Sequence, residues 1–196
     1  MSTLRIDEDL LERMVRAVEK VRERLHRAAR ALEEAQVPYA VIGGNAVAAW
    51  VATVDESAVR NTPDVDLLLR RSDFDAAQAA LTRAGFVRRD IGAVAGFLDG
   101  PTAKARDAVH IIFAGEKVRP GDLLPAPDVC PSQTMVSARV LALESLVPMK
   151  LASFRLKDRV HVRDLIDVGL IGDTWLTRLP AELAPRLKEL LDNPEG

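Results

Sequence analysis

The sequence has a single cysteine, almost no net charge and no long hydrophobic run, and each shortage excludes a class of protein. Cys130 alone excludes an internal disulfide and any zinc site built from cysteines. Residues 1–14 are acidic and amphipathic without an apolar signal core, and no apolar run approaches membrane-spanning length. We therefore expect a cytoplasmic protein with no membrane partner.

The net charge is −2, although charged residues make up 29% of the chain and hydrophobic residues 48%. That balance is typical of a folded protein rather than a disordered one. Because there is no general basic excess, contact with nucleic acid would require a local basic patch. At 196 residues the chain can bury a core, and it fits one domain or one domain with a helical appendage.

The longest periodic stretch runs from Glu8 to Glu34, where apolar residues recur at spacings of three and four, as in an amphipathic helix. The arginines and glutamates between them are expected to form a solvated face. After this helix the apolar run Tyr39–Ile42 predicts a strand. The pair Gly43-Gly44 closes that strand, and a short helix is expected over Asn45–Val54.

Strands and helices alternate in the middle of the chain, and helices alone finish it, which indicates an α/β or α+β core with a helical C-terminal part. Four prolines between Pro120 and Pro131 indicate a loop or connector. We divide the chain into an N-terminal helix (1–36), a core (37–120), a connector (121–139) and a helical part (140–196). The other predicted elements are a strand over Pro63–Leu69, a helix from Ser72 or Asp73 to Ala84, strands over Phe86–Arg89, Gly96–Gly100 and Arg106–Ala114, and helices starting near Ser145–Val147 and covering Leu156–Leu170 and Leu179–Asp192.

Two carboxylates, Asp64 and Asp66, lie in the predicted strand over Pro63–Leu69. Residues two apart on a strand share a face, so these side chains would be neighbours. Adjacent like charges on a largely apolar strand are unfavourable unless a cation lies between them. Carboxylate oxygens suit Mg²⁺, so the pair predicts a magnesium site.

The glycine pair upstream adds a second feature. Gly43 and Gly44 at a strand-to-helix turn let the backbone approach a phosphate, and the N-terminus of the following helix presents free N–H groups to it. A glycine pair after a strand is usually an ordinary turn, so the two carboxylates that follow are what give this one its interest.

In this order the residues resemble the nucleotidyltransferase fold of the polymerase-beta superfamily. Its signature is a glycine pair, a spacer and a D-x-D pair flanked by apolar residues, as in Gly43-Gly44 and Asp64-Val65-Asp66-Leu67. The strand Asp107–Phe113 is similar to the one that carries a third carboxylate in such proteins. The resemblance covers about residues 38–170 and implies an α+β fold, a mixed β-sheet flanked by helices.

A downstream motif resembles that of one subgroup, the bacterial AbiEii-like proteins, which include toxin components of toxin–antitoxin pairs. The matching segments are Met149-Lys150-Leu151, Arg155-x-Lys157-Asp158 and His161-x-x-Asp164-Leu165. The sequence departs from the family in three ways. The spacer between Gly44 and Asp64 is longer, histidine stands at the third-carboxylate position (His110), and His161 stands where an acidic residue is usual.

The resemblance implies a role for each residue. Asp64 and Asp66 would be catalytic and hold Mg²⁺, while Gly43, Gly44 and Asn45 at the start of the helix would cradle the triphosphate of an NTP. Arg60 would reach a phosphate, Lys150 would add positive charge at the nucleotide, and Asp158 and Asp164 would orient the lysine or close the cleft. His110 has three readings: a base for the attacking hydroxyl, a mark of a lost second metal, or a structural core histidine.

The implied function is Mg²⁺-dependent transfer of an NMP from an NTP to an unidentified acceptor, which is RNA such as tRNA, a protein or a small molecule. The alternative is a catalytically weak or inactive binding module, one half of a toxin–antitoxin-like pair with a partner protein. The cluster Arg155, Lys157, Arg159 and Arg163 is either a contact for the RNA backbone or a solvated helix face.

Overall fold

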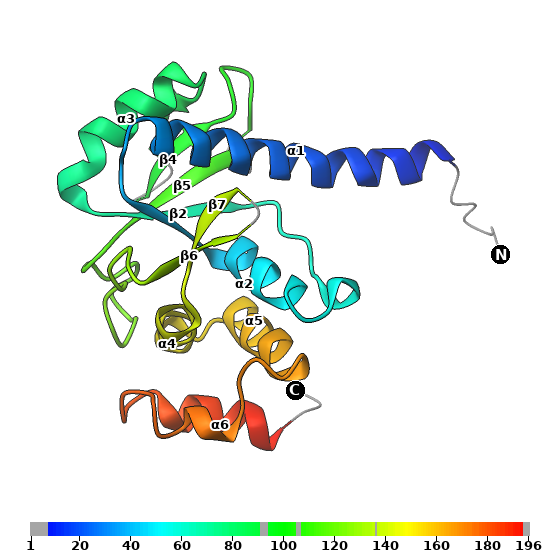
Figure 1. The fold of residues 1–196 in the computed structure, drawn as a ribbon, viewed down its shortest axis with the longest axis vertical. Helices are drawn as coiled ribbons and strands as arrows, with labels where there is room; N and C mark the ends of the chain where they lie inside the picture. The colour runs from blue at the N-terminus through cyan, green and yellow to red at the C-terminus, as the bar shows by residue number, and fades with distance from the viewer. Residues whose placement is uncertain (1–7, 91–93, 105–106, 136, 194–196) are drawn as a thin grey trace.

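The computed structural model describes residues 8–90, 94–104, 107–135 and 137–193. They form an α+β structure in which helices cover a mixed sheet (Figure 1). The α-helices are α1 (Glu8–Glu34), α2 (Gly43–Ala52), α3 (Phe74–Arg83), α4 (Leu143–Ser153), α5 (Leu156–Asp167) and α6 (Ala184–Asp192). The strands are β1 (Tyr39–Ile42), β2 (Val65–Leu69), β3 (Val87–Arg88), β4 (Ala95–Leu98), β5 (Ala108–Phe113), β6 (Ser132–Met135) and β7 (Ala138–Leu141). Short 3-10 helices are η1 (Glu56–Ala58), η2 (Arg71–Asp73) and η4 (Asp173–Trp175).

Within the described residues the sheet has seven strands in the order β3-β4-β5-β2-β1-β7-β6. β1 pairs antiparallel with β2, whereas β2 with β5 and β1 with β7 are parallel. β1 and β2 therefore lie in the middle of the sheet. All their residues are buried except Asp66, which is half-buried. A carboxylate at this position needs compensation, because its neighbours are apolar.

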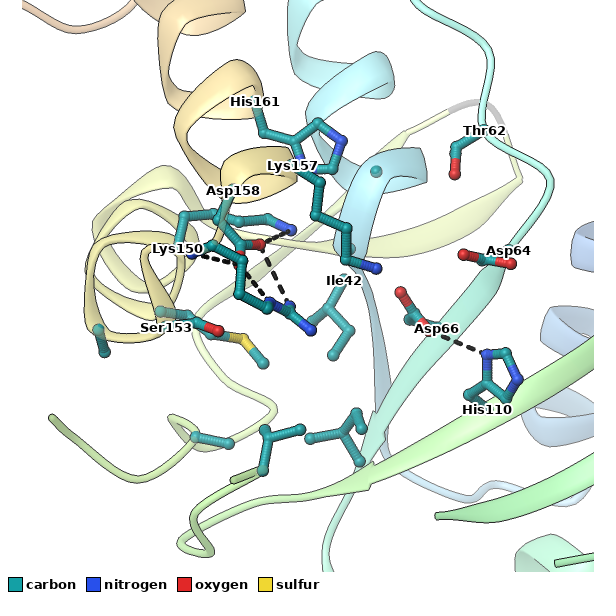
Figure 2. Close-up of a pocket in the computed structure, with 18 of the residues that line it drawn as sticks. Ile42, Thr62, Asp64, Asp66, His110, Lys150, Ser153, Lys157, Asp158 and His161 are labelled. Carbon is teal, nitrogen blue, oxygen red and sulfur yellow. Dashed lines mark hydrogen bonds and ion pairs between the residues drawn. The ribbon is translucent and has the colours of Figure 1, made fainter. Parts of the chain in front are cut away.

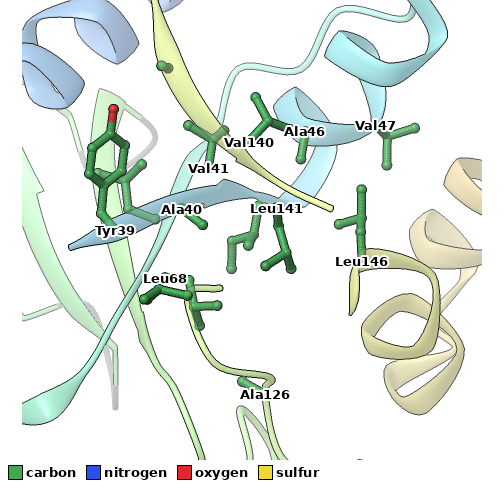
Figure 3. Packing of buried hydrophobic residues seen from close by; sticks show 14 of the residues in the cluster. Tyr39, Ala40, Val41, Ala46, Val47, Leu68, Ala126, Val140, Leu141 and Leu146 are labelled. Carbon is green, nitrogen blue, oxygen red and sulfur yellow. The ribbon is translucent and has the colours of Figure 1, made fainter. Parts of the chain in front are cut away.

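The helices form two groups on opposite sides of the sheet. Figure 1 shows α1 and α3 on one side and α2, α4, α5 and α6 on the other. β1, β7, α2 and α4 contribute side chains to the apolar core, including Val41, Ala46, Leu141 and Leu146 (Figure 3). This packing fixes the end of β1 and the start of α2, where the glycine pair lies. None of the helices in the described ranges is long and apolar enough to cross a membrane.

Only the C-terminal half of α1 packs on the sheet. Ala28 and Leu32 are fully buried, whereas Leu11 and Met14 on the same apolar stripe are at least half exposed. The arginine and glutamate face was expected to be solvated, and for Arg24 this expectation is wrong, because its side chain is buried against loops beneath the helix.

Several predicted elements are confirmed. The helix over Glu8–Glu34 and the strand over Tyr39–Ile42 have the predicted bounds. The strand over Pro63–Leu69 begins at Val65, so Asp64 immediately precedes it. The helix expected from Asn45 begins at Gly43, so the glycine pair forms its first turn. The predicted strand from Arg106 starts at Ala108, and Arg106 lies outside the described residues.

Other predictions need correction. The connector over 121–139 contains β6 and the start of β7, which extend the sheet. Both strands have four residues, and β6 is an edge strand without an alternating apolar pattern, so neither gives a clear periodic signal. α4 begins at Leu143, which puts Pro148 inside the helix, where it removes a backbone hydrogen bond. Burial of Leu146, Val147 and Leu151 against the core stabilises the helix around it.

Replacing Leu32 with alanine should lower the free energy of unfolding by about 2–5 kcal/mol, because buried methyl groups are lost and a cavity remains. The matched control is Leu11→Ala on the same helix, where the side chain is 50% exposed and the change should stay within about 0.5 kcal/mol. Urea unfolding of both variants measures the difference. Equal losses would contradict the packing of only one half of α1.

Candidate functional site

A cavity of about 580 Å³ lies between the sheet and the C-terminal helices. The start of α2, the loop over 60–64, β2 and β5 form one wall, and α4, α5 and the loop over 118–126 form the rest. Figure 2 shows Asp64, Asp66 and His110 on the sheet side, facing Lys150, Lys157 and His161 on the helix side. The cavity thus gathers most residues that the sequence singled out, from segments more than a hundred residues apart.

Asp66 and His110 are neighbours because β2 and β5 pair in register at these residues. The imidazole Nδ1 lies 3.3 Å from Oδ1 of Asp66. This hydrogen bond, helped by the charges of Asp66 and Asp64, outweighs burial and raises the pKa of His110 above its usual value. An imidazole therefore lies opposite Asp66, as the sequence indicated, at the position where the family resemblance implies a third carboxylate.

Asp64 is held through its backbone. Its carbonyl oxygen accepts a hydrogen bond of 2.6 Å from Nδ2 of Asn45, in the first turn of α2. Its side chain points into the cavity beside Asp66 (Figure 2). The expected contact of Asn45 with phosphate stays a prediction, and its side chain also contributes to the position of an acidic residue.

The glycine pair lies directly against Asp66 and Thr62. Gly43 has a φ of +71°, and a Cβ at this residue would collide with Oδ2 of Asp66. A Cβ on Gly44 would approach the side chain of Thr62 to 2.9 Å. Both residues must be glycine for the helix start to lie this close to β2 and its preceding loop. The first turn of α2 consequently lines the same cavity as the carboxylates.

On the helix side, Lys150 is buried and paired. Its Nζ lies 3.3 Å from Oδ1 of Asp158, and the two side chains are 6% and 1% exposed. Burial lowers the pKa of Lys150, although Asp158 opposes that effect. Burial also acts to raise the pKa of Asp158, but the hydrogen bond from Arg155 and the charge of Lys150 hold it below its usual value. Asp158 thus orients Lys150, one of the two roles expected for it.

Arg60 and Asp164 pair with each other. Nε of Arg60 donates to Oδ1 of Asp164 at 2.7 Å, so the loop before β2 is tied to α5. Arg60 was expected to reach a phosphate and Asp164 to orient the lysine or close the cleft. The guanidinium side chain is 68% exposed and lines the cavity, so it retains donors for a ligand while it connects the two walls.

The sequence indicated Lys157 only as part of a motif and of the basic cluster Arg155, Lys157, Arg159 and Arg163, and not as a residue of the nucleotide site. Lys157 lies on the exposed side of α5, yet its amine points across the cavity toward Asp66 (Figure 2). It makes no ion pair with any described residue. His161, one turn later, has a buried Nδ1 without a hydrogen-bond partner, and burial together with the charge of Lys150 lowers its pKa to about 4. Lys157 and His161 are four residues apart in α5, and this spacing could have indicated from the sequence that they share a helix face.

The carboxylate oxygens of Asp64 and Asp66 fit a magnesium ion. No three His, Cys, Asp or Glu side chains gather as a metal cluster in the described part of the chain. Mg²⁺ does not require one, since it commonly binds through one or two carboxylates together with substrate phosphates and water. Asp64 and Asp66, which share one rim of the cavity, are the residues that would hold it.

Gly43→Ala should displace the carboxylate of Asp66. A positive φ costs alanine roughly 1–2 kcal/mol, and the new Cβ would also occupy the space of Oδ2. Gly85→Ala is the matched control, because Gly85 has a φ of +88° with nothing within 4 Å of a Cβ. Both variants should lose stability in urea, but only Gly43→Ala should shift the NMR signals of the Asp66 carboxyl and the His110 ring. Unchanged signals would show that the glycine is not needed for this contact.

No known protein-family model and no curated protein sequence matches this chain. Solved structures do resemble it. The solution structure of the antibiotic-resistance factor ANT(2'')-Ia has a TM-score of 0.51 at 14% identity, over 87% of this chain and 90% of that one. The crystal structure of ANT(2'')-Ia with adenylyl-2''-tobramycin has a TM-score of 0.48 at 15% identity, over 87% and 96%.

A third structure, JHP933 from Helicobacter pylori, has a TM-score of 0.46 at 15% identity, over 91% of this chain and 75% of that one. At these identities the similarity concerns the fold alone, and of these three structures the first has a TM-score above 0.5. The assignment to the AbiEii-like subgroup stays a prediction. The long N-terminal helix, the mixed sheet and the C-terminal helices give this chain the nucleotidyltransferase fold.

Proposed function

We propose that the protein is a Mg²⁺-dependent nucleotidyltransferase that moves an NMP from an NTP to an acceptor oxygen. That oxygen forms a bond to the α-phosphorus while the bond to the bridging oxygen breaks, so pyrophosphate leaves. The observation that carries the proposal is the cavity in which Asp64 and Asp66 face the N-terminus of α2 and the lysines of α4 and α5. Catalysis of this kind mainly positions phosphates and offsets their charge.

The carboxylates of Asp64 and Asp66 would hold the Mg²⁺, which offsets negative charge on the phosphates when bound. The first turn of α2 would receive the phosphates. The N–H groups of Gly43, Gly44 and Asn45 begin this helix, and no side chain caps them among the described residues. Free N–H groups at the positive end of a helix dipole bind phosphate well.

The two lysines would differ in role. Lys150 already has a carboxylate partner in a buried site, so it contributes mainly by holding α4 against α5 through Asp158. Lys157 is exposed, unpaired with any described residue and directed toward Asp66. We assign the contact with the triphosphate to Lys157, with Lys150 as a more distant positive charge.

His110 would accept the proton of the attacking hydroxyl. With a proton on Nδ1 donated to Asp66, Nε2 is free to act as a base. Asp66 orients the ring and raises its pKa, which strengthens it as a base. This arrangement would replace the third carboxylate that the family resemblance implies.

The charge of the cavity favours a neutral or anionic acceptor, such as RNA including tRNA, over a polyamine such as tobramycin. Three of the four carboxylates that line it already have partners among the described residues, namely those of Asp66, Asp122 and Asp158. With Mg²⁺ on Asp64 and Asp66, no carboxylate in this lining is left to bind an amine-rich acceptor.

Membership of the AbiEii-like group, with a partner protein from a two-gene pair, belongs to the same proposal and rests on the motifs of α4 and α5.

The Asp64→Asn/Asp66→Asn double variant should lose Mg²⁺-dependent binding of a non-hydrolysable NTP, because both metal-binding carboxylates are removed. Calorimetric titration with and without Mg²⁺ measures this, and Asp75→Asn on the exposed surface of α3 controls for charge. Equal binding by wild type and the double variant would place the nucleotide elsewhere. No binding by wild type would reject both the enzyme and a nucleotide-binding module, and would favour a module that binds a partner protein.

A binding module that holds nucleotide without transferring it is the second candidate, and the histidine opposite Asp66 is the observation that favours it. His110→Asp separates the two. If His110 is the base, transfer to RNA should fall in the variant, while NTP binding persists. If transfer is absent in wild type and appears in the variant, the histidine marks a site that lost activity.

Lys157→Met should weaken NTP binding by about 10- to 100-fold without changing stability, because a charge-assisted contact with phosphate is lost. Lys150→Met should instead lower stability, since it leaves part of a buried ion pair. Nucleotide titration and urea unfolding of both variants test this division. Loss of binding only in the folded Lys150 variant would reverse our assignment of the two lysines.

A further inference from the structure

Arg24 is a buried cation that the proposed reaction does not use. It lies on α1, on the opposite side of the sheet from α2 and α5 (Figure 1), and is 3% exposed. Its guanidinium donates from Nη1 to the carbonyl oxygen of Pro63 at 3.2 Å, from Nε to Asp99 at 3.3 Å and from Nη2 to Asp107 at 3.4 Å. The two carboxylates compensate the buried charge. The third contact, to a neutral carbonyl, is not needed for that purpose.

The three acceptors lie next to strand ends that are close together in the sheet. Pro63 immediately precedes Asp64, and Asp107 immediately precedes β5, which carries His110. Because β2 and β5 are parallel and paired in register, their first residues lie side by side. Asp99 immediately follows β4, the other neighbour of β5. One planar guanidinium therefore connects the segments immediately before β2 and β5, the two strands that carry Asp66 and His110.

We propose that Arg24 is a positioning residue that aims the carboxylate of Asp64 into the cavity. The peptide group between Pro63 and Asp64 is held on one side by Arg24, which binds the carbonyl of Pro63. The next carbonyl, that of Asp64 itself, is held on the cavity side by Asn45. Two consecutive carbonyl groups fixed from opposite sides leave the backbone of Asp64 little freedom to rotate, so its side chain keeps one direction.

Lysine cannot replace Arg24 in holding these three acceptors. The fork of an arginine presents donors in fixed directions and can reach three acceptors on three segments, whereas an ammonium group is a single point of charge. Arg27, one turn along α1, provides the matched comparison. It also pairs with Asp99 and lies over the ring of Phe86 at 4.4 Å, but it has no contact with Pro63.

The inference rests on the proposed function, since it concerns a carboxylate that would bind Mg²⁺. The experiment compares Arg24→Lys with Arg27→Lys by titrating Mg²⁺ at a fixed concentration of non-hydrolysable NTP. Arg24→Lys should raise the Mg²⁺ concentration at half-saturation about tenfold or more and leave metal-free nucleotide affinity unchanged. Arg27→Lys should change neither. A purely structural role would not shift the metal dependence alone, so an Arg24→Lys curve that matches wild type would overturn the proposal.

A second readout needs no nucleotide. The side-chain amide signals of Asn45, which donates to Asp64, should shift in ¹H–¹⁵N spectra of Arg24→Lys and stay in place in Arg27→Lys. Shifted signals together with absent NTP binding in wild type would refute the proposed function while supporting the positioning role. Unshifted signals would refute the positioning role whatever the nucleotide data show. If Arg24→Lys does not fold, Asp107→Asn loosens only the Nη2 contact and should give the same shifts at smaller amplitude.

Discussion

Asp66 lies where the two central strand pairings of the sheet meet, and its contacts there constrain the rest of the site. The register places it opposite Ile42 of β1 and His110 of β5. Its Oδ1 meets the imidazole, and its Oδ2 fills the space that a Cβ on residue 43 would take. A carboxylate among buried apolar neighbours costs free energy unless it has partners. Glycine at 43 and histidine at 110 are thus the two neighbours that this carboxylate requires.

Positive charge comes from the opposite wall of the cavity. Some of its cations are paired within the protein, and one is not. Asp158 binds both Lys150 and Arg155, which joins the end of α4 to the start of α5. Lys150 and Asp158 are buried and Arg155 is half-buried, and both cations already have Asp158 as a carboxylate partner. Lys157 protrudes from the same helix without a partner among the described residues. An unpaired cation gains more from a phosphate than a paired one does, so in the proposed function the pairing of Lys150 with Asp158 would leave Lys157 as the lysine that contacts the ligand.

Local patterns made part of this structure predictable. The amphipathic period of α1, the apolar run of β1 and the spacing of the glycines and aspartates are properties of short segments, and these elements lie where the sequence indicated. The missed features depend on distant partners. Arg24 is buried because Asp99 and Asp107, 75 and 83 residues away, meet it beneath α1. Arg60 is tied to Asp164, 104 residues away, and no local pattern shows this pairing.

In the proposed function, histidine at position 110 would separate nucleotide binding from proton transfer. A third carboxylate would add negative charge beside Asp64 and Asp66, whereas an imidazole adds none. The pair alone matches the charge of one divalent ion, so a second ion would have to depend on the phosphates. In the proposed reaction, less charge would be available for a second ion, so removal of the acceptor proton would fall to an organic base, and His110 is held by Asp66 in a position suited to that task. Asp66 would therefore serve both steps, with one oxygen toward the imidazole and the other toward the start of α2.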